Sequence, residues 1–194
     1  MPATPIPTAE DLLAGLARWV RLETPTTHPD AVNRLMDIAA ADLREAGAEV
    51  TRIPGRDGFG DTLIARTPDR TAPDGRSGLI AGHLDTVWDP GTIDAMPYRV
   101  TGDTAHGPGI YDMKAGSFLA HHVFCAILRQ RIPTARGLVL LLTPDEEVGS
   151  PTSRAHIERE AAQAAWALIP EPAGAGGACV TARKGVGRFV LRVE

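Results

Sequence analysis

The chain has 194 residues, 43% of them hydrophobic and 23% charged, a composition typical of one soluble globular domain or of one domain and a fraction. Its net charge of −4 and the lack of any run of Lys and Arg argue against a nucleic-acid-binding protein, which needs a basic face. The two cysteines, Cys125 and Cys179, fit no Cys-x-x-Cys pattern and therefore predict neither a disulfide framework nor a zinc site built from thiolates.

Two amphipathic helices and two short strands are predicted in the first part of the chain, at residues 8–23, 29–46, 49–53 and 62–65. Thr8 is a plausible N-cap of the first helix, because Asp11 follows it three positions later and can complete a capping box. The segment TPTTHP separates the two helices, and Gly47 is expected to end the second as its C′ residue.

The rest of the chain alternates apolar runs with helices. The predicted strands are GLIAGH, GLVLLLT and AWALI, at residues 78–83, 137–143 and 165–169. A helix over 114–129 separates the first two, and a helix that begins at Ser150-Pro151, with Ser150 as its N-cap, separates the last two. The second strand is apolar throughout, as in strands covered on both faces. The alternation predicts an α/β fold with a mostly parallel sheet and helices on both faces.

The apolar stretches and the first residues also predict a location. No basic stretch precedes an apolar one near the N-terminus, so a secretory signal is not predicted. No stretch approaches the roughly 18 apolar residues that a membrane span needs. We therefore expect a cytoplasmic protein without a membrane partner.

Acidic residues and one histidine follow the ends of the three apolar runs or lie in the loop between the first two. They are His83, Asp85, Asp112, Asp145, Glu146, Glu147 and Glu171. The carboxyl ends of parallel strands meet at one edge of a sheet, where ligands bind, so these side chains are expected to lie together. Crowded carboxylates repel one another and raise each other's pKa, and a divalent cation would relieve that repulsion. An acidic turn in contact with solvent at a helix N-terminus is the alternative interpretation of residues 145–147.

The residue types indicate which metal and which chemistry are expected. Histidine and carboxylate ligands suit Zn²⁺, and also Mn²⁺ or Co²⁺. Asp85 could accept the second imidazole N–H of His83, which would fix the tautomer of the ring. The adjacent Glu146 and Glu147 could divide two tasks, one binding metal and the other holding a proton of the attacking water.

The order of these motifs resembles the M20 metallopeptidases, the dizinc carboxypeptidase and aminoacylase clan, and most of all its glutamate carboxypeptidase branch. The resemblance runs from GHLDTVW through MPYRVTGDTAHGPGIYDMKAG to TPDEEVGSPTSR and IPEP, and it includes the tail TARKGVGRFVLRV. It implies the catalytic-domain fold of dizinc exopeptidases, with two Zn²⁺ ions in each active site. The implied reaction hydrolyses an amide bond in a small peptide or N-acyl amino acid and releases a C-terminal amino acid.

The resemblance also implies a role for each site residue. Asp112 would bridge the two metals, and the peptide bond after it, Asp112–Met113, is expected to be cis. His83 and Glu171 would complete the first metal site, and Glu147 would bind the second metal. Asp85 would orient the metal-binding His83, and Glu146 would be the general base that acts on a metal-bridging water.

Family members are longer than this chain, so the resemblance predicts two unequal parts. Residues 1–182 would form the N-terminal portion of the catalytic domain, and residues 183–194 would begin a strand that leads to a lid and dimerisation domain. That domain and a late histidine ligand are absent from a chain of this length, which is therefore expected to be truncated. The full-length family is expected to form homodimers.

Two alternatives to the carboxypeptidase interpretation stay open. The first is an N-acyl amino acid deacylase or deacetylase of the same family. The second is a catalytically inactive, truncated remnant that still binds metal. Three other histidines, His106, His121 and His122, are not expected to replace the late histidine, because the first lies in a loop and the others lie in the middle of a predicted helix.

Overall fold

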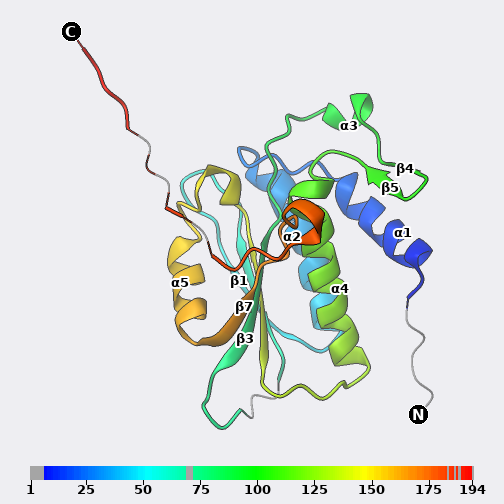
Figure 1. Ribbon diagram of the computed structural model, residues 1–194, viewed down its shortest axis with the longest axis vertical. Coiled ribbons are helices and arrows are strands. Elements are labelled where there is room, and N and C mark those ends of the chain that lie inside the picture. Colours follow the sequence, from blue (N-terminus) through cyan, green and yellow to red (C-terminus); the bar gives the residue numbers. More distant parts are fainter. Residues whose placement is uncertain (1–6, 69–71, 183, 186, 188, 194) are drawn as a thin grey trace.

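The computed structural model describes residues 7–68, 72–182, 184–185, 187 and 189–193. A five-stranded sheet of order β1-β2-β6-β3-β7 lies at its centre, and helices pack on both faces (Figure 1). The strands are β1 (Glu49–Ile53), β2 (Thr62–Arg66), β3 (Ser77–His83), β6 (Leu138–Thr143) and β7 (Ala164–Leu168). These elements lie close to the predicted positions, and the α/β class is confirmed.

The strand directions confirm a mostly parallel sheet. β3 pairs in parallel with β6 and with β7, whereas β2 runs antiparallel to both of its neighbours, β1 and β6. Four of the five strands therefore point the same way. In the register of the central pair His83 lies opposite Thr143, so β3 and β6 end side by side. The residues that follow these two strands are thereby delivered to one edge of the sheet.

Helices of different number cover the two faces. On one face pack α1 (Ala9–Val20), α2 (Pro29–Glu45) and α4 (Ala115–Arg129), and on the other packs α5 (Arg154–Ala162) (Figure 1). The remaining elements are short: α3 (Thr92–Ala95), β4 (Arg99–Thr101), β5 (Thr104–His106) and the turns η1 (Ile110–Lys114), η2 (Glu146–Val148) and η3 (Ala175–Gly177). In the described part of the chain, no helix is both long enough and apolar enough to cross a bilayer.

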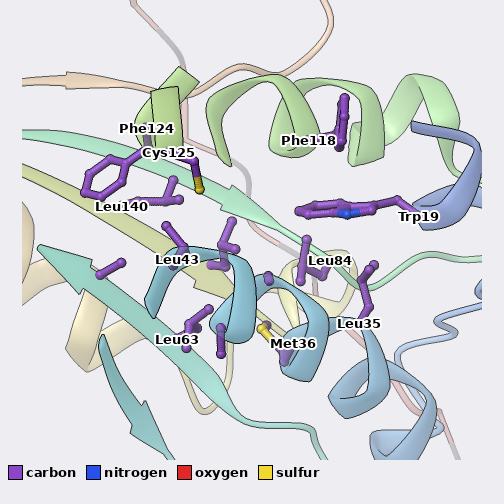
Figure 2. Close-up of a cluster of buried hydrophobic side chains, with 14 of the residues drawn as sticks. Trp19, Leu35, Met36, Leu43, Leu63, Leu84, Phe118, Phe124, Cys125 and Leu140 are labelled. Atoms are coloured by element: carbon purple, nitrogen blue, oxygen red, sulfur yellow. The ribbon is translucent and has the colours of Figure 1, made fainter. Parts of the chain in front are cut away.

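The main core lies between the sheet and the three helices of the first face. Figure 2 shows its side chains, with Leu43 of α2 near Leu63 and Leu140 of the sheet and Leu35 of the same helix near Leu84. Successive side chains of β6 point to opposite faces, so alternate leucines enter this core while Val139 and Leu141 enter a smaller cluster beneath α5. All six residues of β6 are buried, as predicted for a strand covered on both faces.

The predicted N-cap of the first helix and the predicted C′ residue of the second are confirmed, although the first helix ends at Val20, before the predicted residue 23. The hydroxyl of Thr8 accepts a hydrogen bond from the backbone N–H of Asp11, and the Asp11 side chain accepts one from the backbone of Thr8, which completes the capping box. Gly47 has a φ of 97°, the left-handed conformation that ends a helix at C′. Sequence pattern alone was sufficient here because each cap is made by residues within one turn of the helix.

The prediction that a helix begins at Ser150-Pro151 with Ser150 as N-cap is wrong. Ser150 has a φ of 57° and its side chain caps nothing, and α5 begins at Arg154. A residue that precedes the turn stabilises it: the buried carboxylate of Asp145 accepts hydrogen bonds from the backbone N–H and hydroxyl groups of Thr152 and Ser153. These bonds keep residues 151–153 in a turn and delay the start of the helix.

The last predicted strand is found, but only Ala164 of β7 is buried. β7 is an edge strand, with β3 on one side alone. No strand is assigned among the described residues of the range 183–194, and Arg188 and Glu194 lie outside the described residues. Apolar side chains from Phe189 to Val193 are 86–96% exposed. The division of the chain at residue 182 stays a prediction.

Candidate metal centre

The acidic residues and His83 meet at the edge where β3 and β6 end. His83 is the last residue of β3, Asp112 lies in η1, Glu146 and Glu147 open η2 directly after β6, and Glu171 follows β7. Two groups of side chains have potential ligand atoms that all lie within 4.8 Å of one another inside the group. One group is His83, Asp112 and Glu147, and the other is His83, Glu146 and Glu171. Three segments that are far apart in the sequence therefore converge on the imidazole at the end of a fourth.

The imidazole of His83 is buried, and its two nitrogens face different partners. Nδ1 lies 2.9 Å from the backbone carbonyl oxygen of Asp85 and 3.3 Å from Oδ1 of the same residue. Since both partners accept, they hold a proton on Nδ1, so Nε2 is the nitrogen that a metal ion would bind by displacing its proton. Nε2 faces the carboxylates, 3.1 Å from Asp112 Oδ1, 3.5 Å from Glu171 Oε1 and 3.9 Å from Glu146 Oε2. The ring is thus oriented as a metal ligand is, although the shorter hydrogen bond that Nδ1 donates goes to a backbone carbonyl.

Asp85 also binds the segment that carries the two glutamates. Its carboxylate, fully buried, accepts hydrogen bonds of 3.2 Å from the backbone N–H groups of Glu146 and Glu147. It accepts another from the hydroxyl of Thr26. One carboxylate therefore contacts both the histidine at the end of β3 and the turn at the end of β6. The spacing of His83 and Asp85 predicted the first contact, but nothing local to either motif indicated the second.

Asp112 is positioned by a turn that is anchored on both sides. Before it, Gly109 has a φ of 66° and a Cβ there would stand 2.4 Å from a methyl carbon of Thr86, so glycine is required. After it, the Asp112–Met113 peptide bond is cis, as expected. The buried ammonium of Lys114 then donates to the carbonyl oxygens of Trp19 and Leu22 at the C-terminal end of α1. No pattern in the sequence indicates this role of Lys114.

The electrostatics of the site are those of crowded carboxylates around one cation. Burial opposes protonation of His83, but the hydrogen bonds and charges of Asp85 and Glu171 outweigh burial and raise the pKa of His83 to about 11. Burial, with the neighbouring carboxylates, raises the pKa of Glu147 to about 7. Burial also raises the pKa of Glu146. A divalent cation among these groups would displace protons, because positive charge stabilises the ionised carboxylates.

The donor set fits a divalent transition metal. It offers one imidazole nitrogen with its proton on the far side, and four carboxylates that supply oxygen atoms at ligand spacing. Nitrogen and oxygen donors of this kind suit Zn²⁺, Co²⁺ and Mn²⁺. A groove lined by Asp112, Glu146, Glu171 and residues 167–170, 172–173 and 178–182 adjoins the carboxylates. The carboxylates of Asp112, Glu146 and Glu171 are therefore accessible from this groove.

The other histidines considered from the sequence lie elsewhere. Neither ligand group, among the residues described, includes His106, His121 or His122. His106 is in β5, and His121 is buried on α4 with Nε2 3.2 Å from the carbonyl oxygen of Ala39. Cys179 lines the groove and is exposed, and Cys125 is buried in the core. No disulfide joins them, as the sequence indicated.

Solved structures of similar fold include peptidases. Human carnosine dipeptidase 1 superposes with a TM-score of 0.69 at 16% identity, covering 85% of this chain and 39% of that chain. The M20 family metallo-carboxypeptidase of Sulfolobus solfataricus superposes with a TM-score of 0.67 at 16% identity, covering 84% of this chain and 38% of that chain. At these identities the likeness establishes the fold alone.

Sequence relatives are more similar. Carboxypeptidase G2 of Pseudomonas sp. (strain RS-16) is 32% identical over 162 residues, which is 83% of this chain and 38% of the relative. Succinyl-diaminopimelate desuccinylase of Corynebacterium glutamicum is 30% identical over 161 residues, 81% of this chain and 40% of the relative. The chain thus spans about two fifths of the length of these relatives. The sequence pattern described as Peptidase family M20/M25/M40 matches residues 79–184, more than half of the chain and every candidate site residue, and the chain belongs to that family.

Proposed function

We propose that this chain carries the metal-binding part of a hydrolase that cleaves an amide bond and releases a C-terminal amino acid. The observation that carries the proposal is the convergence of three segments on Nε2 of His83, each with a carboxylate oxygen within 3.9 Å of that nitrogen. Membership of a peptidase family supports the reaction type. The proposed ligands are His83, Asp112, Glu147 and Glu171.

Each remaining residue has a proposed task in that reaction. A divalent metal, when bound, polarises the scissile carbonyl and lowers the pKa of water. Glu146 has a raised pKa and a half-exposed side chain that borders the groove, so it is suited to hold a proton while staying accessible to substrate. We assign it as the general base that takes a proton from the attacking water. As the carbon–oxygen bond forms and the carbon–nitrogen bond breaks, Glu146 delivers that proton to the leaving amine.

The names of the two sequence relatives support different substrates. A carboxypeptidase releases a C-terminal residue, which favours a peptide or an N-acyl amino acid such as an N-acyl glutamate. A desuccinylase removes a succinyl group, which favours the alternative, deacylation of an N-acyl amino acid. Both reactions hydrolyse an amide bond and release a product that carries a carboxylate, so the same catalytic residues could perform either reaction. Zinc is the proposed metal, with Co²⁺ or Mn²⁺ as alternatives, and the cytoplasmic location and the homodimer stay predictions.

Hydrolysis and metal binding together test the proposal. The zinc-loaded chain should be assayed with an N-acyl-L-glutamate and with N-succinyl-diaminopimelate, beside Glu146→Gln and the control Glu158→Gln on the exposed side of α5. We expect E146Q to bind zinc as wild type does and to lose at least about 100-fold in rate. The control should match wild type. Zinc binding without hydrolysis of any amide substrate would instead support the inactive, metal-binding remnant.

A further inference from the structure

Two segments far apart in the sequence lie side by side next to the metal centre. The connection between α1 and α2 forms a parallel bridge between Pro25 and Thr86. The backbone N–H of Thr86 donates to Thr24 at 2.8 Å, and the N–H of Thr26 donates to Thr86 at 3.2 Å. This connection is therefore fixed against the residues that follow β3, and it places the side chain of Thr26 against Asp85.

The hydroxyl of Thr26 donates to Asp85 Oδ2 at 2.8 Å. A backbone carbonyl, that of Thr86, lies farther away at 3.3 Å. A hydroxyl has one proton, and a carboxylate accepts it more strongly than a neutral carbonyl does. Thr26 is 5% exposed and Asp85 is fully buried, so water does not compete for this bond.

The bond from Thr26 is the shortest of those described for the Asp85 carboxylate. The other contacts of that carboxylate, with His83 Nδ1 and with the N–H groups of Glu146 and Glu147, measure 3.2–3.3 Å. Contacts of that length constrain the orientation of a carboxylate less than a bond of 2.8 Å does. Among these contacts, the hydrogen bond from Thr26 therefore constrains the rotation of the Asp85 carboxylate most, and Thr26 is not one of the proposed metal ligands.

We propose that Thr26 is a positioning residue for the metal centre. By fixing the Asp85 carboxylate, its hydroxyl keeps the His83 ring and the backbone of Glu146 and Glu147 in one arrangement. It thereby couples the ligand at the end of β3 to those at the end of β6. The inference rests on the proposed metal centre and not on hydrolysis.

A matched threonine in the same segment makes the test specific. Thr24 is also fully buried, and its hydroxyl donates to the backbone carbonyl of Leu84 at 2.6 Å without touching Asp85. Thr24→Val and Thr26→Val each remove one buried hydroxyl and keep the shape of the side chain. Thr26→Ser keeps the hydroxyl and removes a methyl group. Wild type and these three variants should be compared for zinc affinity by chelator competition and for stability by urea unfolding.

We expect T26V to weaken zinc binding about tenfold, in the range typical of residues that orient a ligand. T24V and T26S should stay within about twofold of wild type, since both retain the donor to Asp85. Equal losses of zinc affinity in T24V and T26V, or no loss in T26V, would overturn the inference. If T26V does not fold, Thr26→Cys replaces it, because a thiol of similar size is a weak donor.

A second measurement does not require bound metal. Hydrogen exchange of the backbone amides of Glu146 and Glu147 reports whether Asp85 still holds them. We expect faster exchange at both amides in T26V than in T24V at equal global stability. Unchanged exchange would overturn the role of Thr26. Failure of wild type to bind zinc, with the exchange difference present, would overturn the metal centre and leave the positioning role intact.

Discussion

Gly116 lies against the backbone of Pro170. An ideal Cβ on Gly116 would stand 1.8 Å from the carbonyl oxygen of Pro170, far inside van der Waals contact. Gly116 is in the first turn of α4, directly after the turn that carries Asp112, and Pro170 directly precedes Glu171. The close approach therefore brings two of the proposed ligand segments into contact, and it is possible only because residue 116 is a glycine without a side chain.

Gly116→Ala should displace the segment that carries Glu171. The added methyl group meets backbone atoms, which cannot rotate away as the end of a side chain can. We expect zinc affinity to fall at least about tenfold, and stability to fall by about 1–3 kcal/mol from overpacking. Chelator competition and urea unfolding measure the two effects.

Gly15→Ala is the control for this substitution. Gly15 is a glycine within α1, and its added Cβ would meet the ring of Phe118 at 2.5 Å, away from the carboxylates. We expect G15A to reduce stability and to leave zinc affinity within about twofold of wild type. Unchanged zinc affinity in folded G116A would show that this contact does not position Glu171.

Asp145 has a structural role within the acidic run. It is fully buried and accepts four hydrogen bonds from the backbone N–H and hydroxyl groups of Thr152 and Ser153. Asp145→Ala leaves these donors without an acceptor, so we expect a loss of about 3 kcal/mol in the free energy of unfolding. The exposed Glu158→Ala should change it by less than about 0.5 kcal/mol. Similar stabilities of the two variants in urea would argue for a solvent-exposed acidic turn.

Most helices, the strands and the sheet edge where His83 and the carboxylates meet could be predicted from the sequence. Hydrophobic period and local capping residues, such as Thr8 and Gly47, are contained within a few neighbouring positions, and parallel topology then aligns the strand ends. The start of α5 could not be predicted in this way. The residues that control it, Asp145 and Thr152, form hydrogen bonds seven positions apart that replace the N-cap expected at Ser150.

The meeting of His83 with the carboxylates was predictable, but the contacts that hold these side chains in place were not. His83 and Asp85 are two positions apart, so a contact between them follows from the sequence. The bond between Thr26 and Asp85 joins residues 59 positions apart, and a threonine in a turn-rich segment has no pattern that identifies its partner. Likewise, Lys114 reaches the end of α1 only because α4 packs on that helix.

His121 should make the stability of the fold depend on pH. Burial lowers the pKa of His121 below its ordinary value of 6.5, so the unfolded chain binds more protons than the folded chain as pH falls through that value. The stability contribution is complete above pH 6.5 and is lost progressively below it. His121→Gln should therefore lose less stability than wild type between pH 7.5 and pH 5.5 in urea unfolding.

The neighbouring His122 provides the control for that measurement. It lies on the same helix, and its charge lowers the pKa of His121 less than burial does, so His122→Gln should reduce the pH dependence less than His121→Gln does. Equal pH dependence in H121Q and wild type would show that another group is responsible.

Zinc binding to the purified 194-residue chain tests the central claim most directly. Wild type, Glu171→Ala and the exposed control Glu158→Ala should be equilibrated with zinc, and bound metal and affinity measured while circular dichroism verifies the fold. We predict about one equivalent or more per chain in wild type and in E158A, and an affinity at least about tenfold lower in E171A. A folded wild-type chain that binds no zinc, or a folded E171A that binds it as tightly as wild type, would contradict the proposed metal centre.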